Sequence, residues 1–200
     1  MEAFDPETLA IYAKEAPDYA ASGPGGIGRH LEPFLERLPP GGKVLELGCG
    51  SGRDAAQMIA RGFTVEPTDG VPEMAAQAEA RLGQPVRVMR FDELDAVGQY
   101  DGVVASYSLL HTPRSGLEAT LRRIWRALKP GGWHAASYKT AAIEGRDRLG
   151  RYYNYPSESA LRQFYSAAGE WSDLVCKSGE GQGYEGGVSR FIMIMVRKAD

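Results

Sequence analysis

The residues most able to bind a polar ligand are the glycine-rich run 48–52, which reads GCGSG. An apolar run precedes it and a run of helix formers follows it, which predicts a tight strand-to-helix turn. Glycine permits positive φ angles and lets a ligand approach the backbone. The free N–H groups at the start of the following helix attract anions and polar oxygens. A turn that binds nothing could use the same residues, so the run alone is weak evidence.

A single acid strengthens the case for a ligand. Asp69 ends the next expected strand after the glycine run. A carboxylate at such a strand tip can accept the hydroxyl protons of a ribose, and it could equally cap the helix that we expect over residues 71–82. Glu66 is the rival acid, but it falls inside the strand. At this point NAD and S-adenosylmethionine both fit the pattern.

The elements that would position these residues alternate along the chain. We expect strands at 43–47, 63–68, 86–89, 100–105 and 133–137, and helices at 53–61, 71–82, 117–128 and 157–168. Such alternation implies right-handed crossovers and a parallel sheet. The runs 171–177 and 190–196 are strand-like with no helix between them, which predicts antiparallel neighbours. The sequence therefore predicts an α/β, doubly wound, mostly parallel seven-stranded sheet with a C-terminal antiparallel hairpin, although Pro67 is awkward in the second strand.

The 200 residues fit one domain with four parts. Residues 1–42 would form a helical lid, with helices at 7–20 and 31–38. Residues 43–138 would form the ligand-binding core. Residues 139–156 would form a substrate loop, and residues 157–200 a closing helix and hairpin.

Composition excludes several classes of protein. Lys and Arg number 23 against 26 Asp and Glu, so the net charge is −3 and lacks the basic footprint of a nucleic-acid binder. Cys49 and Cys176 are outside any CxxC pair and the three histidines are scattered, so we expect no metal site. No apolar run reaches 18 residues, so we expect no membrane span. A cytoplasmic monomer or homodimer is expected, with an exposed edge strand near 171–177.

Several segments in order resemble class I S-adenosylmethionine-dependent methyltransferases. Residues 44–55 (VLELGCGSGRDA) are similar to the first family motif, with Glu46 before the glycines, whereas a dinucleotide fingerprint wants a small residue where Arg53 stands. Residues 65–74 resemble the second motif and residues 91–94 (FDEL) the third. Residues 100–111 and 121–133 resemble the fourth strand and the helix before the fifth. The SGRDA and LLHTP segments resemble small bacterial tellurite-resistance-like (type 11) members.

The resemblance implies a Rossmann-like methyltransferase fold and S-adenosylmethionine as the cofactor. It implies that Asp69 holds the ribose, that Met74 lies near the adenosyl group and that Asp92 accepts from the adenine amino group. The implied cofactor-binding residues are Glu46, Gly48, Cys49, Gly50, Arg53, Asp54, Asp69, Gly70, Met74, Phe91, Asp92, Glu93, Leu94 and Ser106. Two departures stand out: Val71 replaces a frequent serine, and residues 106–109 (SYSL) lack the motif that base-methylating enzymes use.

Methyl transfer needs an acceptor aligned with the sulfonium methyl, and it needs a base only if the acceptor loses a proton. His111 and Tyr107 follow the fourth strand and are the candidate catalytic residues, since histidine titrates near neutral pH. His111 could instead pack and cap the next helix. His134 lies inside the fifth strand, where a packing role is expected.

A small-molecule acceptor is expected at the loop after the fifth strand. Tyr138, Lys139, Arg151 and Tyr152 could bind an anionic or aromatic acceptor, or they could belong to a solvated loop. Tyr12 and Tyr19 could cover the cofactor as part of a lid that hinges at residues 23–28. Two alternatives stay open: a domain that binds S-adenosylmethionine without catalysis, and an NAD-dependent oxidoreductase, against which Arg53 argues.

Overall fold

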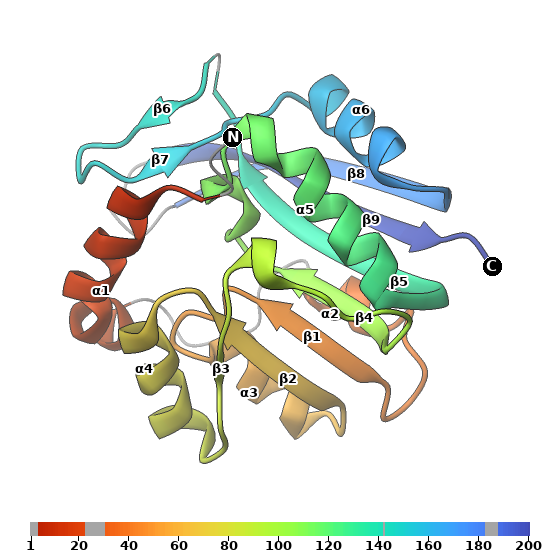
Figure 1. Cartoon of the computed structure of the whole chain (residues 1–200), viewed down its shortest axis with the longest axis horizontal. Coiled ribbons are helices and arrows are strands. Elements are labelled where there is room, and N and C mark those ends of the chain that lie inside the picture. The colour runs from red at the N-terminus through yellow and green to blue at the C-terminus, as the bar shows by residue number, and fades with distance from the viewer. Residues whose placement is uncertain (1–3, 23–30, 142, 183–187) are drawn as a thin grey trace.

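The computed structural model describes residues 4–22, 31–141, 143–182 and 188–200. Its seven-stranded sheet has the order β3-β2-β1-β4-β5-β9-β8. The first five of these strands run parallel, whereas β9 is antiparallel to both β5 and β8. The strands are β1 (Lys43–Leu47), β2 (Thr64–Asp69), β3 (Arg87–Val88), β4 (Tyr100–Ala105), β5 (Leu128–Lys139), β8 (Trp171–Gln182) and β9 (Val188–Lys198). The predicted mostly parallel sheet with its antiparallel hairpin is confirmed (Figure 1).

Helices cover both faces of the sheet because the buried strand residues alternate between two cores. Leu45, Leu47 and Val103 belong to one apolar cluster, which also takes in the helices α5 (Arg114–Ala127) and α6 (Glu158–Ala168). Val44 and Val104 belong to the other, with α2 (Leu31–Leu35) and Met58 of α3 (Arg53–Ala60). Strands buried on both faces are the expected form of a parallel sheet.

The N-terminal helix α1 (Pro6–Ala21) begins as a capped helix and packs on α4 (Pro72–Leu82). Asp5 accepts a hydrogen bond from the Thr8 N–H at 2.8 Å, and a proline occupies the first turn. Ala16 of α1 is buried against Val71 and Met74. The carboxyl ends of β1 and β2 point towards α1, which places the helix over the edge where ligands bind in such sheets (Figure 1).

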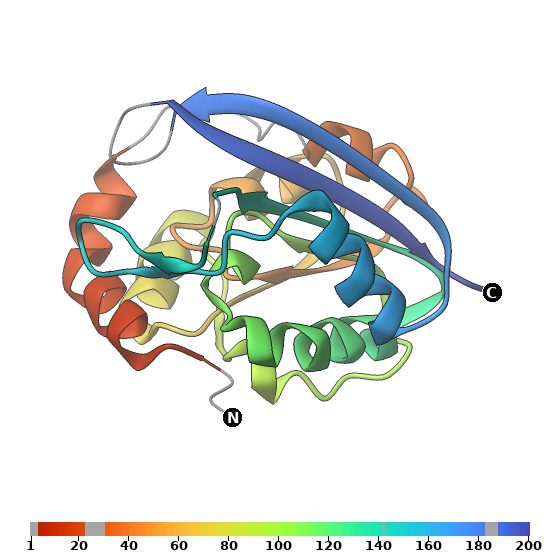
Figure 2. The same ribbon diagram turned by 90° about the horizontal axis from the view of Figure 1, so that it is seen from above.

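The loop after β5 forms a hairpin of its own. Its short strands β6 (Gly145–Arg146) and β7 (Tyr152–Tyr153) pair antiparallel, and two 3₁₀ turns occur elsewhere, η1 (Phe91–Glu93) and η2 (Leu109–His111). Figure 2 shows this hairpin lying beside α1. None of the helices in the described ranges is long and apolar enough to cross a membrane.

Several predicted boundaries were wrong. Two strands differ most: β3 has two residues rather than four, and β5 begins at Leu128 rather than at 133. The predicted loop between the last two strands is mostly strand, since β8 continues to Gln182 and β9 starts at Val188. Glycine at position 179 lets the Phe191 ring lie against β8, because a Cβ there would come within 2.7 Å of the ring.

Pro67 fits its strand because of where its backbone points. The carbonyls of Val65 and Asp69 accept from Gln84 and Met89, on the β3 side of the strand. Because backbone groups alternate along a strand, Pro67 faces that same side. The β3 ladder starts only at the next residue, so the missing N–H breaks no bond to β1.

Candidate functional site

A cavity lies at the carboxyl ends of the parallel strands. We call it the central cavity; it encloses about 750 Å³ including its mouth, a size typical of small-molecule sites. Eleven residues that the sequence singled out line it: Tyr12, Tyr19, Gly48, Gly50, Asp69, Gly70, Met74, Phe91, Ser106, Tyr107 and His111. Residues from β1, β2 and β4 ends therefore converge on one space, as in ligand sites of doubly wound sheets.

The glycine loop turns in the way its composition predicts. Gly48, Gly50 and Gly52 have φ angles of 71°, 56° and 75°, which other residues adopt at a cost. A Cβ at Gly48 would lie 2.5 Å from the Ser108 Cβ, so a side chain there would clash. A Cβ at Gly50 would come within 3.3 Å of the Tyr19 ring across the cavity. The loop thus leaves backbone as the floor of the central cavity.

Asp69 joins the glycine loop to the next helix. Its two carboxylate oxygens accept the backbone N–H groups of Gly50 and Val71, each at 2.9 Å. Burial raises the pKa of Asp69 to about 6, although these N–H bonds act in the opposite direction. Each oxygen keeps a further lone pair for a ligand hydroxyl. The N-cap of α4 is Val71, without a side-chain cap bond, so the expectation that Asp69 caps this helix is wrong. The position of Asp69 remains compatible with ligand binding.

Four residues implied by the first motif do not line the central cavity: Glu46, Cys49, Arg53 and Asp54. Glu46 is buried below the loop, where burial and the charges of Asp54 and Asp69 raise its pKa well above the usual range. Cys49 packs against α4, and burial raises the pKa of its thiol. Arg53 donates to the carbonyls of Ala20 and Ser22 and so ties the end of α1 to α3.

The third motif is only partly turned towards the cavity. Phe91 lines it, whereas Leu94 is buried in the apolar core. Asp92 pairs with the Arg90 guanidinium at 3.1 Å, and Glu93 accepts from the Arg90 N–H at 2.8 Å. Arg90 itself lines the cavity. Sequence reasoning missed Arg90 because the motif draws attention to the acids that follow it.

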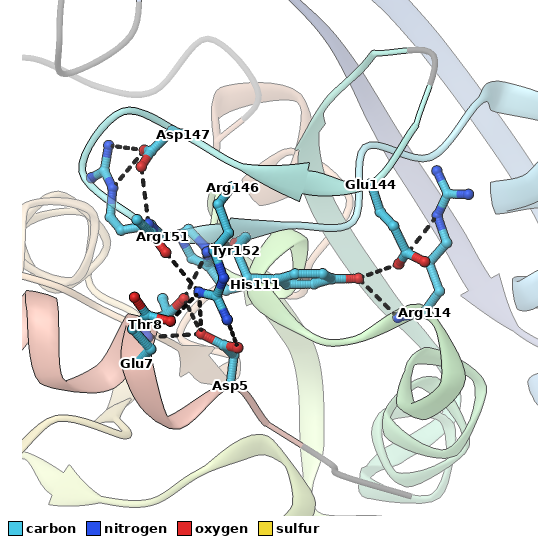
Figure 3. A network of polar contacts seen from close by, with 11 residues as sticks. Asp5, Glu7, Thr8, His111, Arg114, Glu144, Arg146, Asp147, Arg151 and Tyr152 are labelled. Carbon is cyan, nitrogen blue, oxygen red and sulfur yellow. Dashed lines mark hydrogen bonds and ion pairs between the residues drawn. The ribbon is translucent and has the colours of Figure 1, made fainter.

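His111 lies in a defined hydrogen-bond network between α1 and the β6–β7 hairpin (Figure 3). Its Nδ1 is 2.6 Å from the Tyr152 carbonyl, which can only accept, so Nδ1 carries the proton. Its Nε2 then accepts from the Tyr12 hydroxyl at 3.0 Å. Burial lowers the pKa of His111 to about 4, and the nearby Arg151 and Lys139 charges add to this effect. The ring is therefore neutral near pH 7.

Polar contacts also connect the helix α1 to the hairpin. The Arg146 guanidinium lies 2.7 Å from the Asp5 carboxylate and 3.2 Å from that of Glu7. The Thr8 hydroxyl accepts the Tyr152 N–H at 2.8 Å. Figure 3 shows these residues converging from the two elements. The predicted hinge at residues 23–28 lies outside the described residues.

A second cavity adjoins the central cavity. It encloses about 630 Å³ including its mouth and is lined by Tyr12, Tyr19, Tyr107, Leu110, His111, Lys139, Arg151, Tyr153, Gly181, Ser189 and Phe191. Two of the four expected substrate residues are here, Lys139 and Arg151. Tyr138 is instead fully buried in the core, 3.5 Å from the Tyr165 hydroxyl. The Tyr152 hydroxyl turns away to donate to Glu144.

Position along a strand explains the placement of Tyr138 and Lys139. Successive side chains of β5 point to opposite faces, so only one of the two neighbours can reach the cavity. Phe4, Thr8 and Leu9 also line the central cavity, whereas the sequence singled out only Tyr12 and Tyr19 within the expected lid. Thr8 and Leu9 lie on the helix α1, where their spacing resembles ordinary packing. No group of three metal-ligating side chains occurs within the described ranges.

Comparison with known sequences adds a family match. A family model of the methyltransferase domain matches residues 19–172. A Synechocystis methyltransferase described as uncharacterized is 32% identical over 112 residues, 54% of this chain and 53% of that protein. The ubiquinone biosynthesis O-methyltransferase of Xanthomonas axonopodis pv. citri is 34% identical over 110 residues, 51% of this chain and 45% of that protein. The chain spans about half, or less, of the length of the curated relatives it matches.

Solved structures show the same fold at low sequence identity. The Burkholderia thailandensis 1,6-didemethyltoxoflavin-N1-methyltransferase, solved with 1,6-didemethyltoxoflavin and S-adenosylhomocysteine, superposes with a TM-score of 0.69 at 24% identity, covering 97% of this chain and 90% of that one. A S-adenosylmethionine-dependent methyltransferase of Methanosarcina mazei gives a TM-score of 0.71 at 16% identity, covering 82% and 96%.

Proposed function

Because the chain belongs to the methyltransferase-domain family, we propose that it transfers a methyl group from S-adenosylmethionine to a small-molecule acceptor. One observation carries the proposal: the central cavity gathers the glycine loop, the Asp69 carboxylate, Met74, Phe91 and the end of β4 in one space. Among nucleotide-type ligands, this arrangement suits an adenosyl group with its ribose at a strand tip.

The residues that would hold the cofactor fit it chemically. Asp69 keeps acceptor capacity on both oxygens beyond its backbone bonds, as a ribose diol requires. Gly50 leaves the backbone bare where a side chain would fill the cavity. Met74 and Phe91 supply apolar walls for an adenine ring. Asp92 remains the proposed partner of the adenine amino group, reached by rearranging its pair with Arg90.

When bound, S-adenosylmethionine supplies an electrophilic sulfonium methyl. The chain's own task is to bind and align the acceptor and to exclude water. Tyr12 and Tyr19 of the lid cover the central cavity from above, which serves that purpose. The neutral His111 Nε2 accepts a hydrogen bond from the Tyr12 hydroxyl. If the acceptor gives up a proton to the Tyr12 oxygen, the Tyr12 proton can pass to Nε2. Tyr107 would position the acceptor, since it lines both cavities.

A small acceptor is favoured over a macromolecular one by the way the site is covered. The second cavity is lined by residues of α1, of β7, of the end of β5 and of the β8–β9 pair. We also propose a reducing, cytoplasmic setting, which the free thiols of Cys49 and Cys176 support. We propose a monomer or a homodimer; in a homodimer, β8 could pair with a second copy because it is an edge strand of the sheet.

Calorimetric titration with S-adenosylmethionine, S-adenosylhomocysteine and NADH tests the proposal. We expect micromolar binding of both adenosyl ligands and none of NADH. Binding of NADH alone would overturn the cofactor assignment. Tight binding of the adenosyl ligands with no methylation across an acceptor panel would point instead to a domain that binds the cofactor without catalysis.

A further inference from the structure

Tyr12 lies at the boundary between the two cavities. Tyr12, Tyr19, Tyr107 and His111 line both the central cavity and the second cavity. An acceptor in the second cavity would meet a cofactor in the central cavity at these side chains, because the reacting atoms have to approach to about 3 Å. A polar atom with a fixed hydrogen-bond direction at this boundary would select the chemical group that can be methylated there. The Tyr12 hydroxyl has such a fixed direction.

His111 fixes the direction of the Tyr12 O–H bond. The Tyr152 carbonyl can only accept, so His111 carries its proton on Nδ1, 2.6 Å from that oxygen, and its Nε2 is unprotonated. The Tyr12 hydroxyl oxygen lies 3.0 Å from Nε2 and therefore donates its proton to it. Tyr12 and Tyr153 pack edge to face against the imidazole, with ring centres 5.3 and 4.6 Å away. Burial lowers the pKa of His111 to about 4, so this direction persists at neutral pH.

Arg151 takes up one lone pair of the same hydroxyl oxygen. Its guanidinium has only N–H donors, and one of them donates to the Tyr12 oxygen at 3.2 Å. The Arg151 side chain is buried and lies 2.7 Å from the Asp147 carboxylate, so it cannot turn away from Tyr12 without breaking an ion pair. A phenol oxygen has one proton and two lone pairs. Its proton is given to His111 and one lone pair is used by Arg151, which leaves one lone pair.

Among the residues that the structure describes, the Tyr12 hydroxyl has no third polar partner, so a ligand that bonds to it has to donate. From this polarity we infer that the atom methylated by this protein bears a hydrogen, as in a hydroxyl or an N–H group, and donates it to the Tyr12 oxygen. The inference rests on the proposed function, because it assigns the acceptor of the same site. A carboxylate, a thiolate or a nitrogen without hydrogen would place its lone pair against that of Tyr12 and is disfavoured.

The same hydrogen bonds provide a path for the proton that such an acceptor loses. As the acceptor atom forms its bond to the methyl carbon, the electron pair of the broken C–S bond stays on sulfur and S-adenosylhomocysteine is left. The acceptor proton passes to the Tyr12 oxygen, and the Tyr12 proton passes to His111 Nε2. One positive charge is lost at sulfur and one appears on the imidazole, so the total charge of the site is unchanged.

Each neighbour of Tyr12 has one part in this step. His111 orients the hydroxyl before the reaction and holds the proton afterwards, when its Nδ1–H still donates to the Tyr152 carbonyl. Arg151 keeps one N–H on the Tyr12 oxygen throughout, which stabilises negative charge that develops there as the proton leaves. Both residues therefore act on the acceptor through Tyr12, and Tyr12 is the residue that contacts it.

Binding of matched small molecules tests the inference without turnover. The probes are phenol, fluorobenzene and anisole, which share one ring but of which only phenol can donate a hydrogen bond. They are titrated by ligand-observed NMR at pH 7.5 with saturating S-adenosylhomocysteine. Flat probes suit the second cavity because the rings of Tyr107, Tyr153 and Phe191 line it. We expect phenol to bind about fivefold more tightly than either of the others, the scale of one hydrogen bond. Equal affinity of the three, or no binding of any, would overturn the inference.

Removal of single hydroxyl groups locates the effect. Tyr12→Phe should weaken phenol about fivefold and leave fluorobenzene and anisole unchanged, because only phenol uses the lost oxygen. Tyr100→Phe is the matched control, since the Tyr100 hydroxyl donates to Glu66 and lines neither cavity, and it should keep the wild-type preference. A Tyr12→Phe protein that still prefers phenol would overturn the assignment to Tyr12.

S-adenosylhomocysteine is titrated alone against all three proteins, which separates this inference from the proposed function. If S-adenosylhomocysteine fails to bind the wild-type chain, the proposed function fails. If it binds while phenol shows no preference over fluorobenzene, only the acceptor class is wrong. Its binding to Tyr12→Phe also shows that this variant is folded, so that a lost preference for phenol reports the hydroxyl and not the fold.

Discussion

At the scale of single residues, the most informative group is Asp69, because its environment opposes its charge. The carboxylate is buried at the floor of the central cavity, and burial raises its pKa to about 6. Ribose hydroxyls would donate to the ionised form, so ligand binding should favour ionisation. The affinity for the cofactor is therefore tied to pH through this one carboxyl group.

We predict that the affinity for S-adenosylhomocysteine falls as the pH drops below about 6, by up to about tenfold per unit, because the ligand then has to displace a proton. Asp69→Asn should weaken binding at pH 7.5 by about 1.5 to 3 kcal/mol and abolish this pH dependence, since its NH₂ group would face a backbone N–H. Calorimetry at pH 5, 6 and 7.5 measures both effects. Glu66→Gln removes a carboxylate from the same strand, one that instead pairs with Tyr100 and Lys43, and should leave binding unchanged.

His111 gives a second prediction at this scale. With burial lowering its pKa to about 4, the ring should remain neutral between pH 5.5 and 8, with its proton on Nδ1. Nitrogen-15 NMR of the histidine rings reads both the charge and the tautomer. The His111→Gln spectrum assigns the signal. A ring that titrates near pH 6.5 would contradict the buried, Tyr12-bonded geometry.

Motif reading and structure differ at this scale for a simple reason. The glycine run and the strand-end position identified Gly50 and Asp69, and the family resemblance implied Met74; all three line the cavity. The motif could not show that Arg90 would line the cavity and that Asp92 would pair with Arg90, because the turn η1 sets the directions of both side chains. Motifs give the order of residues, whereas side-chain direction depends on backbone geometry that a single sequence does not contain.

At the scale of elements, the helix α1, which we propose to be a lid, makes polar contacts with the β6–β7 hairpin and apolar contacts with α4. Periodicity predicted α1, α4 and the parallel strands because each has a clear apolar pattern. It did not predict β6, β7 or the outer parts of β8 and β9. Those strands are rich in glycine and polar residues and exist only because a partner strand pairs with them.

We predict that Arg146→Gln loosens the lid without unfolding the protein. The substitution removes the ion pairs with Asp5 and Glu7, which are solvent-accessible and add little to global stability. Backbone amides of α1 should exchange with deuterium several-fold faster, and S-adenosylhomocysteine should dissociate faster. Arg162→Gln breaks a comparable pair with Glu158 on α6 and is the control. Unchanged exchange in α1 would show that apolar packing on α4 alone holds the lid.

At the scale of the whole molecule, buried ionisable groups couple stability to pH in opposite directions. His134 sits inside the sheet, where Nδ1 donates to the Val103 carbonyl and Nε2 accepts from the Tyr165 hydroxyl. Burial lowers its pKa to about 4, so it is neutral when folded and binds a proton when unfolded below pH 6.5. Its contribution to the free energy of unfolding is therefore lost as the pH falls from 6.5 towards 4. Asp69, whose pKa is raised, acts in the reverse sense.

Comparing His134→Gln with the wild-type chain isolates the contribution of His134 to the pH dependence of stability. When the pH falls from 7 to 5, the free energy of unfolding should decrease by about 2 kcal/mol less in His134→Gln than in the wild-type chain. The reason is that glutamine keeps one donor and one acceptor but does not titrate. Urea unfolding at both pH values measures the difference. Leu161→Ala removes buried apolar contacts from the same core without touching an ionisable group, so it should be less stable at both pH values yet keep the wild-type pH dependence. If His134→Gln also keeps that dependence, the sheet does not hold His134 in its neutral form, and the acid sensitivity arises from other groups, such as Asp101, whose pKa the Lys129 contact lowers.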